Sequence, residues 1–324
     1  MTLGQQPPEP RAALAGRHTE RLLLERVVRG AAQGRPGAVL LHGEAGVGKT
    51  RLVADVVQGA QADGFHLLWG QCLHFGASSS PYLPIASAFD SWLTAAEPDD
   101  RDALLADVPT ITDLLPRTPG GTTDADSARL LATVDAAVTA LTDQRPTVLI
   151  IDDLQWADVT SLDVLAYLIA GPRHRPLSLV LSYRDEELPE GHPLHGWLAD
   201  MLRMPTVTDV PLERFTVEET TDQLALLLGG RPTEALVAAV QRRSAGNAYF
   251  NELLVRGIDR HAEELPADLP HMLRVAVLAK WHALDEATRE VVRIVSAAGR
   301  PLSATYLASL TGRLGVPDAQ VRHA

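Results

Sequence analysis

Residues 42–50 read His-Gly-Glu-Ala-Gly-Val-Gly-Lys-Thr and fit the pattern G-x-x-x-x-G-K-S/T of a phosphate-binding loop. A short apolar run, residues 38–41, comes just before the loop, as a buried parallel strand would. Residues 51–57 follow the loop and carry apolar side chains at helical spacing. Strand, glycine-rich loop and helix therefore come in the order that phosphate binding requires, and we expect a nucleotide-binding site here.

The residue types in the loop suit a bound polyphosphate. Glycines let several backbone amides point inward without Cβ clashes, and a helix beginning near Lys49 adds the partial positive charge of its N-terminus. Lys49 is expected to reach the β- and γ-phosphates, and the Thr50 hydroxyl to ligate Mg²⁺. An ordinary glycine turn is the weaker explanation. Lysine occurs only at positions 49 and 280, so the motif is rarely matched by chance in such a chain. The residues expected to contact ATP or ADP at this loop are Gly43, Glu44, Ala45, Gly46, Val47, Gly48, Lys49, Thr50 and Arg51.

A second set of candidate residues follows two later apolar runs. Residues 147–151 are the most strand-like run in the chain, and Asp152 and Asp153 close it. Asp152 is expected to hold the Mg²⁺ shell through water, and Asp153 to polarise the attacking water as a general base. Two solvated aspartates in a strand-end turn are the alternative. Residues 177–183 form the next apolar run, and Arg184 after it is a candidate sensor of the γ-phosphate, unless it only pairs with Asp185 or Glu186 at the surface.

Composition narrows the class of protein. The chain has 324 residues, of which 46% are hydrophobic and 22% charged, so a large α/β domain with smaller helical ones is possible. A net charge of −12 argues against a broad DNA-binding footprint within these residues. Cys72 is the single cysteine, which excludes an internal disulfide. Because no apolar run has the length of a membrane span or of a signal-peptide core, we expect a soluble, cytoplasmic protein with no membrane partner.

The pattern along the chain predicts an α/β core followed by helices. Expected strands cover residues 38–41, 65–70, 147–151, 177–183 and 207–212, with helices between them, which is typical of a parallel, doubly wound sheet. We expect residues 1–14 to be disordered and the acidic stretch 97–124 to be a surface excursion. The core should end near Arg214. The expected helices beyond it start with a capping box at Thr216 and Glu219, continue from Thr233 to about Ser244, and cover 251–261, 269–283, 287–298 and 303–310.

Several motifs resemble those of one known family. Residues 152–158, Asp-Asp-Leu-Gln-Trp-Ala-Asp, resemble the signature D-D-L-H-W-A-D of a bacterial branch of the signal transduction ATPases with numerous domains, which includes the large ATP-binding regulators of the LuxR family. Gln155 stands where that signature has histidine. Residues 15–20 resemble a G-R-E-x-E motif that precedes the phosphate loop, and residues 181–184 resemble the family's sensor strand. Residues 246–254 resemble the lid motif G-N-P-F-F-x-x-E-L-L, with Ala248 in place of the proline.

The resemblance implies a three-layer αβα core at 15–214 with strand order 5-1-4-3-2, a helical lid at 215–264 and the start of a winged-helix domain at 265–324. It places Gly16 and Arg17 near adenine. It further implies a slow, Mg²⁺-dependent ATPase in which exchange of ADP for ATP acts as a switch and permits self-association. DNA would be bound only by a C-terminal domain outside this chain. The alternative is a turnover AAA-type ATPase, such as a helicase loader, that acts on nucleic acid or protein partners.

Overall fold

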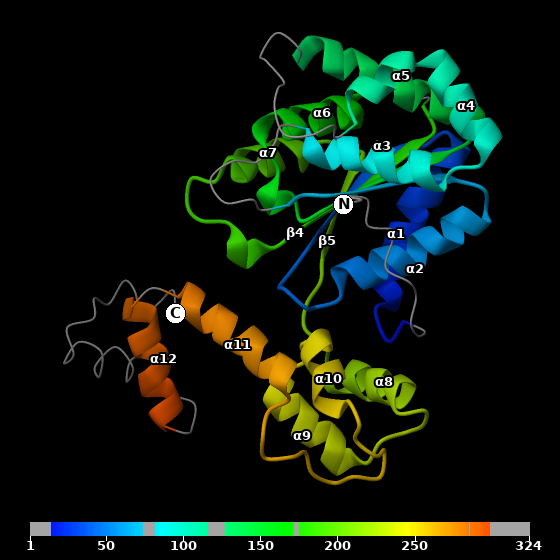
Figure 1. The fold of residues 1–324 in the computed structure, drawn as a ribbon. Coiled ribbons are helices and arrows are strands. Elements are labelled where there is room, and N and C mark those ends of the chain that lie inside the picture. Colours follow the sequence, from blue (N-terminus) through cyan, green and yellow to red (C-terminus); the bar gives the residue numbers. More distant parts are fainter. Residues whose placement is uncertain (1–13, 74–81, 116–126, 172–174, 285, 299–324) are drawn as a thin grey trace. The chain divides into compact units, whose positions relative to one another are not determined.

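The computed structural model describes residues 14–73, 82–115, 127–171, 175–284 and 286–298 (Figure 1). The chain forms two compact units, Met1–Glu263 and Glu264–Ala324. The expected disordered residues up to position 13 and the expected helix over 303–310 lie outside the described residues.

A five-stranded parallel sheet lies at the centre of the first unit. Its strands are β1 (Gly37–His42), β2 (His66–Gln71), β3 (Thr147–Asp152), β4 (Leu177–Tyr183) and β5 (Val207–Pro211). Their order is β2-β3-β4-β1-β5, which is the expected 5-1-4-3-2 counted from the other edge. The central strands are buried along nearly their whole length, as parallel strands covered on both faces must be. Because His42 pairs with Tyr183 and Ile151 pairs with Leu181, β1, β3 and β4 end at the same edge of the sheet.

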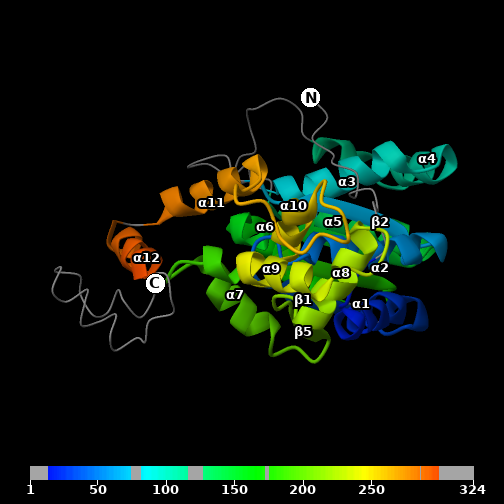
Figure 2. The same ribbon diagram turned by 90° about the horizontal axis from the view of Figure 1, so that it is seen from below.

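Helices cover both faces of the sheet, which gives the three-layer αβα core expected from the sequence (Figures 1 and 2). Alternate strand residues face opposite sides: Val39 and Leu41 pack with the helices α1 (His18–Gly30) and α2 (Lys49–Ala62). Leu40 and Leu149 belong to the other cluster. That cluster packs under α3 (Leu83–Ala95), α5 (Ser127–Gln144), α6 (Val159–Ala170) and α7 (Pro193–Met201).

The expectation of a surface excursion over 97–124 is wrong for its first half. Residues Pro98–Asp107 form helix α4, and Pro109–Asp113 form a 3₁₀ turn. Leu104 and Ile111 are fully buried in the same cluster as α3 and α5. The acidic residues mislead because two of them lie in the first turn of α4, where the helix dipole favours negative charge. Residues 116–124 lie outside the described part of the chain.

Three helices follow the core within the first unit, and we call them the lid: α8 (Val217–Leu227), α9 (Glu234–Ser244) and α10 (Ala248–Val255). The predicted capping box at Thr216 and Glu219 and the predicted cap at Thr233 are confirmed. The helix predicted over 251–261 is wrong in its bounds. Asn247 accepts a hydrogen bond from the Phe250 amide and starts α10 earlier, and the helix ends at Val255, two residues before Gly257 with its φ of +79°.

The second unit contains α11 (His271–Ala283) and α12 (Glu286–Ala298). Arg293 pairs with Glu286 and Glu290, and its guanidinium lies 5.5 Å from the centre of the Trp281 ring. The winged-helix prediction for this unit stays a prediction. No helix in the described ranges is long and apolar enough to cross a membrane.

Candidate functional site

The phosphate loop depends on glycine for its backbone geometry. Gly43, Gly46 and Gly48 have φ values of +142°, +81° and +111°, in the range that L side chains rarely adopt. A Cβ atom on Gly43 would lie 2.3 Å from the Leu212 carbonyl oxygen, so even alanine does not fit there. The loop therefore requires glycine at the positions where the sequence motif has it.

Lys49 begins α2 and lies within the loop, with only 6% of its surface exposed. Its Nζ donates to the carbonyl oxygens of Gly43, at 2.6 Å, and of Glu44, at 3.0 Å. Burial lowers the pKa of Lys49, and the nearby positive charge of Arg184 lowers that pKa further. The ammonium is thus held at the loop by weak neutral acceptors, which an anionic ligand can replace.

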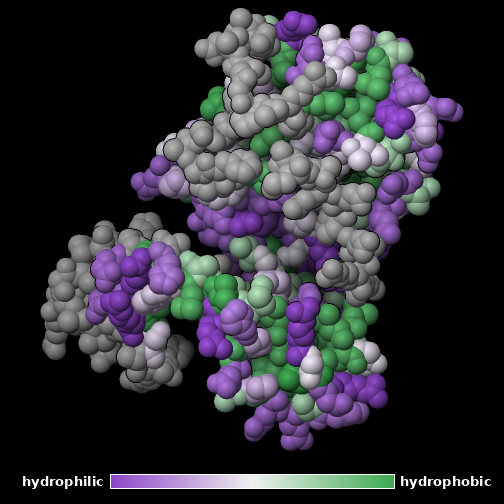
Figure 3. All heavy atoms as spheres, in the orientation of Figure 1, coloured by the Kyte–Doolittle hydropathy of each residue, from purple (hydrophilic) through white to green (hydrophobic). Residues whose placement is uncertain are grey.

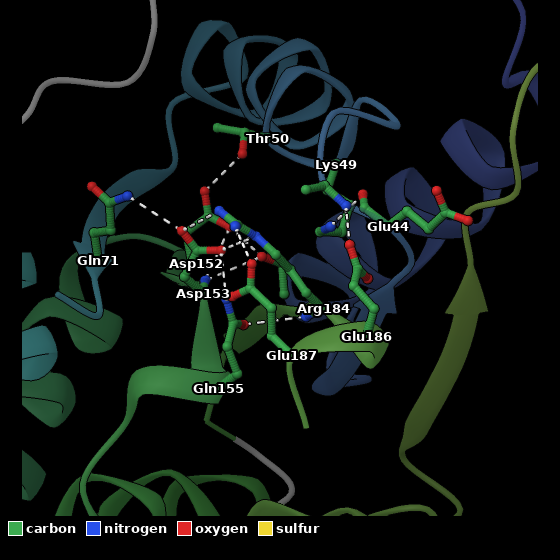
Figure 4. Close-up of polar contacts among 12 residues, drawn as sticks. Glu44, Lys49, Thr50, Gln71, Asp152, Asp153, Gln155, Arg184, Glu186 and Glu187 are labelled. Atoms are coloured by element: carbon green, nitrogen blue, oxygen red, sulfur yellow. Dashed lines mark hydrogen bonds and ion pairs between the residues drawn. The ribbon is translucent and has the colours of Figure 1, made fainter. Parts of the chain in front are cut away.

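The expected magnesium ligands meet across two elements. Thr50 Oγ1, at the start of α2, donates to Asp152 Oδ2, at the end of β3, over 2.8 Å (Figure 4). The other Asp152 oxygen accepts hydrogen bonds from the Ser182 hydroxyl and the Asp153 amide. A hydroxyl and a carboxylate are hard oxygen donors, which fit Mg²⁺. The described residues contain no group of three or more His, Cys, Asp or Glu that could hold a metal ion.

Asp153 belongs to a group of four side chains that we call the Arg184 cluster: Asp153, Gln155, Arg184 and Glu187 (Figure 4). Asp153 has the left-handed backbone conformation, with φ +62°, which aspartate tolerates better than most residues. Arg184 Nε lies 3.0 Å from Asp153 Oδ1, and Arg184 NH1 lies 2.6 Å from Glu187 Oε1. Burial lowers the pKa of Arg184, but Asp153 and Glu187 outweigh it and raise that pKa above its usual value. The sequence motif places Asp153 and Arg184 at one site, and the structure brings them into direct contact.

Gln155 links the other three residues of the cluster through hydrogen bonds. Its Nε2 donates to both Asp153 Oδ1 and Glu187 Oε2, each at 3.1 Å, and its Oε1 accepts from the Arg184 amide. Gln155 is only 2% exposed, so its orientation is determined by these contacts. The motif quoted from the sequence contains Gln155, but no sequence signal pairs it with Glu187, because that pairing depends on the 3₁₀ turn after β4.

A cavity of about 260 Å³ opens between the phosphate loop, the Arg184 cluster and the lid. This is close to the lower end of the roughly 300–1,000 Å³ typical of ligand pockets. Its lining residues come from both parts of the first unit: Gly46, Gly48, Lys49, Thr50, Arg51, Asp153 and Arg184 from the core, and Gln223, Ala248, Tyr249 and Glu252 from the lid.

Arg17 lies beside a second, much smaller cavity of about 30 Å³. Its guanidinium contacts the carbonyl oxygens of Val47 and Glu213 and lies 4.5 Å from the centre of the Phe215 ring. Arg17 Nε is buried without a partner among the described residues. Gly16 has φ +60°, which strains other residues, and a Cβ there would lie 2.9 Å from the Glu219 side chain. Arg17 lines this second cavity, whereas Gly16 lines neither of the two, and their expected place near adenine stays a prediction.

The tip of the phosphate loop is bonded to the lid and to the segment that leads into it. Asn247 Nδ2 donates to the Ala45 carbonyl at 2.9 Å, and the Tyr249 amide donates to the Gly46 carbonyl at 2.9 Å. The Glu44 side chain turns away from the cavity and accepts two hydrogen bonds from Arg214. Hydrophilic residues also gather at this end of the core in Figure 3. Asn247 and Tyr249 lie within the lid motif at 246–254, but that motif does not predict their contacts with the loop, because these depend on how α10 is placed.

The parallel αβα core, the glycine loop and the acidic strand end define a P-loop nucleotide-binding fold. In agreement with this, residues 13–181 match the family model described as AAA ATPase domain. The chain therefore belongs to the AAA ATPase domain family. No curated protein sequence matches the chain.

Several solved structures are similar to this chain at low sequence identity. The Walker-type ATPase of Pyrococcus abyssi is 15% identical over 86% of this chain and 76% of that chain, with a TM-score of 0.50. The Orc1 protein of Aeropyrum pernix in complex with DNA is 16% identical over 98% and 84%, with a TM-score of 0.47. A RuvB variant of Thermotoga maritima is 16% identical over 95% and 85%, with a TM-score of 0.44. At 15% identity, the likeness to the Pyrococcus abyssi ATPase concerns the fold alone.

Proposed function

We propose that the chain is a nucleotide-dependent switch that binds ATP or ADP with Mg²⁺ and hydrolyses ATP slowly. The arrangement that carries the proposal is the bonding of the phosphate loop to the lid through Asn247 and Tyr249. Because a nucleotide at this loop would touch the same backbone segment, its arrival or loss can change how the lid is held. By resemblance, such a module would control a transcriptional regulator of the LuxR family whose DNA-binding domain lies outside this chain.

Each site residue has a proposed task. Lys49 and the loop amides bind the β-phosphate, and Lys49 and Arg184 bind the γ-phosphate. Thr50 and Asp152 hold Mg²⁺, which when bound neutralises charge on the phosphate oxygens. Asp153 accepts a proton from the attacking water. Its two oxygens are engaged by Arg184 and Gln155, so they must be released first, which supports slow hydrolysis.

The energies of such a switch are demanding. A ligand at a hundredfold its dissociation constant stabilises the bound form by about 2.7 kcal/mol. Moving an equilibrium from mostly closed to mostly open takes roughly 5.5 kcal/mol of differential binding. One contact between Arg184 and the γ-phosphate is too weak for this, and we propose that ATP-dependent self-association supplies the rest.

The test is to purify the chain, identify its bound nucleotide by mass spectrometry, and follow ATP hydrolysis with and without DNA. Retained ADP together with turnover well below about 1 per second, unchanged by DNA, is the expected result. Sites without nucleotide and fast hydrolysis that DNA stimulates would instead support a turnover ATPase. A chain that binds no nucleotide at all would contradict both.

A further inference from the structure

Three consecutive carboxylates follow the sensor strand, and two of them face the candidate site. Asp185, Glu186 and Glu187 form the 3₁₀ turn after β4, which we call the acidic turn. Figure 4 shows Glu186 beside the phosphate loop and Glu187 beside Arg184. Asp185 turns away from the cavity, with its carboxylate 2.9 Å from His42 Nδ1.

Glu186 occupies a hydrogen-bond donor of the phosphate loop. Its Oε1 accepts from the Ala45 amide over 2.7 Å. Backbone amides of such a loop are the groups that bind anions, and Ala45 is next to Gly46, which lines the cavity. A carboxylate at this position is therefore an anion that the protein itself supplies to its own phosphate loop.

Glu187 likewise occupies a hydrogen-bond donor of Arg184, the candidate γ-phosphate sensor. Its Oε1 lies 2.6 Å from Arg184 NH1, the shorter of the two ion pairs that hold this guanidinium. The side chains of Arg184 and Glu187 are only 30% and 27% exposed, so water competes only partly with the pair. A γ-phosphate that binds Arg184 must share this donor with Glu187.

We propose that Glu186 and Glu187 are specificity-determining residues that make the site prefer a nucleoside diphosphate to a triphosphate. This inference rests on the proposed function, because it assumes that the cavity holds a nucleotide. The diphosphate needs Lys49, the loop amides and the helix N-terminus. Of these groups, the two glutamates occupy only the Ala45 amide. The triphosphate adds a charged group at the end of the site where both carboxylates lie, so it pays for like-charge repulsion and for the loss of their hydrogen bonds.

Other charges near these carboxylates agree with this picture. Glu186 and Asp153 both act to raise the pKa of Lys49, opposing the larger effect of burial, so Lys49 lies within the field of the acidic turn. The side chain of Glu186 is exposed, and solvent screens its charge. We therefore expect each glutamate to change selectivity by about five- to tenfold rather than by the larger factor of a fully buried pair.

The test uses the full chain and the variants Glu186→Gln and Glu187→Gln, with Asp185→Asn as the matched control from the same turn. Dissociation constants are measured by calorimetry for ADP and for a non-hydrolysable ATP analogue, both with Mg²⁺, at low and high salt. We expect the ratio of the analogue's constant to that of ADP to fall about five- to tenfold in each glutamine variant. The ratio should stay within twofold of the wild-type value in Asp185→Asn.

The outcomes separate this inference from the function on which it rests. If the wild-type chain binds neither nucleotide, the proposed function fails and the inference fails with it. If the wild-type chain binds both, and the ratio is unchanged in either glutamine variant, the inference is wrong for that residue while the function stands. An equal change in Asp185→Asn would show a general effect of net charge and would overturn the proposal for both glutamates.

Discussion

Lys49 is the residue on which nucleotide binding depends most directly. Its ammonium is buried and held by two loop carbonyls, so removing it takes away the cation that is positioned inside the loop. We expect Lys49→Ala to weaken ADP binding by at least about a hundredfold, or roughly 2.7 kcal/mol, as measured by calorimetry. Lys280→Ala removes the chain's other lysine, in α11, and should leave the affinity unchanged. Wild-type affinity in Lys49→Ala would refute its assignment.

Asp153 should affect hydrolysis and spare binding. Asparagine keeps the size and hydrogen-bonding shape of the side chain, but it cannot accept a proton from water. We expect Asp153→Asn to slow single-turnover ATP hydrolysis by about a hundredfold or more, with the dissociation constant of ADP changed by less than about threefold. Asp200→Asn removes an exposed carboxylate from α7 and serves as the control. An unchanged hydrolysis rate would remove Asp153 from the mechanism.

Chemical labelling of Cys72 tests whether the edge of the sheet at β2 stays buried. The thiol is 3% exposed, and burial, together with the negative charges of Asp153, Asp158 and Asp152, raises its pKa well above its usual value. A raised pKa means that less thiolate is present at any pH below it, and the thiolate is the reactive form. At pH 8 we expect a thiol reagent to label the folded chain at least about a hundredfold more slowly than the chain in denaturant. Equal rates would show that β2 opens readily.

At the scale of elements, the sequence predicts strands better than it predicts their surroundings. The runs 147–151 and 177–183 are apolar throughout because they are buried on both faces, so their pattern indicates their place in the sheet. The prediction for the stretch around Leu104 is wrong because most acidic residues of α4 come first and its few apolar residues form no clear stripe. Its buried face is explained by packing in the cluster that also contains α5. The prediction for α10 is wrong at the ends of the helix. Its cap, Asn247, also makes the contact with the phosphate loop.

That double role of Asn247 gives a prediction for the lid. Asn247→Asp keeps the oxygen that caps α10, but it removes the Nδ2 donor and places a carboxylate against the Ala45 carbonyl. We expect the Tyr249 amide, which bonds to Gly46, to lose protection from hydrogen exchange by about tenfold, since its neighbouring contact is gone. The rest of α10 should stay folded.

A matched control distinguishes this effect from a general loss of stability. Thr233→Ala removes the cap of α9 and the hydrogen bond to the Ala262 carbonyl, without contact to the loop. It should cost about 1 kcal/mol of unfolding free energy and leave the exchange of the Tyr249 amide close to the wild-type rate. If both variants expose that amide equally, the lid and the loop are not coupled through Asn247.

At the scale of the whole molecule, the sequence predicts which residues converge and leaves open how they are held. Parallel strands bring their carboxyl ends to one edge, so a loop after β1, an aspartate pair at the end of β3 and an arginine after β4 must meet there. The side chains that hold these site residues in place cannot be predicted in this way. Gln155, Glu187 and Asn247 make their contacts through side-chain orientations in turns and caps, and no periodic pattern records such orientations.

The same convergence predicts that nucleotide binding belongs to the first unit alone. Every described residue that lines the two cavities lies before Glu264, where the second unit begins. We expect a fragment of residues 1–263 to fold and to bind ADP within about threefold of the full chain. At a hundredfold its dissociation constant, ADP should stabilise the fragment by about 2.7 kcal/mol, which for a domain of this size raises the Tm by roughly 5–10 °C. If the fragment folds but binds ADP more than about tenfold more weakly, the second unit contributes to the site, and the nucleotide is recognised by the two units together.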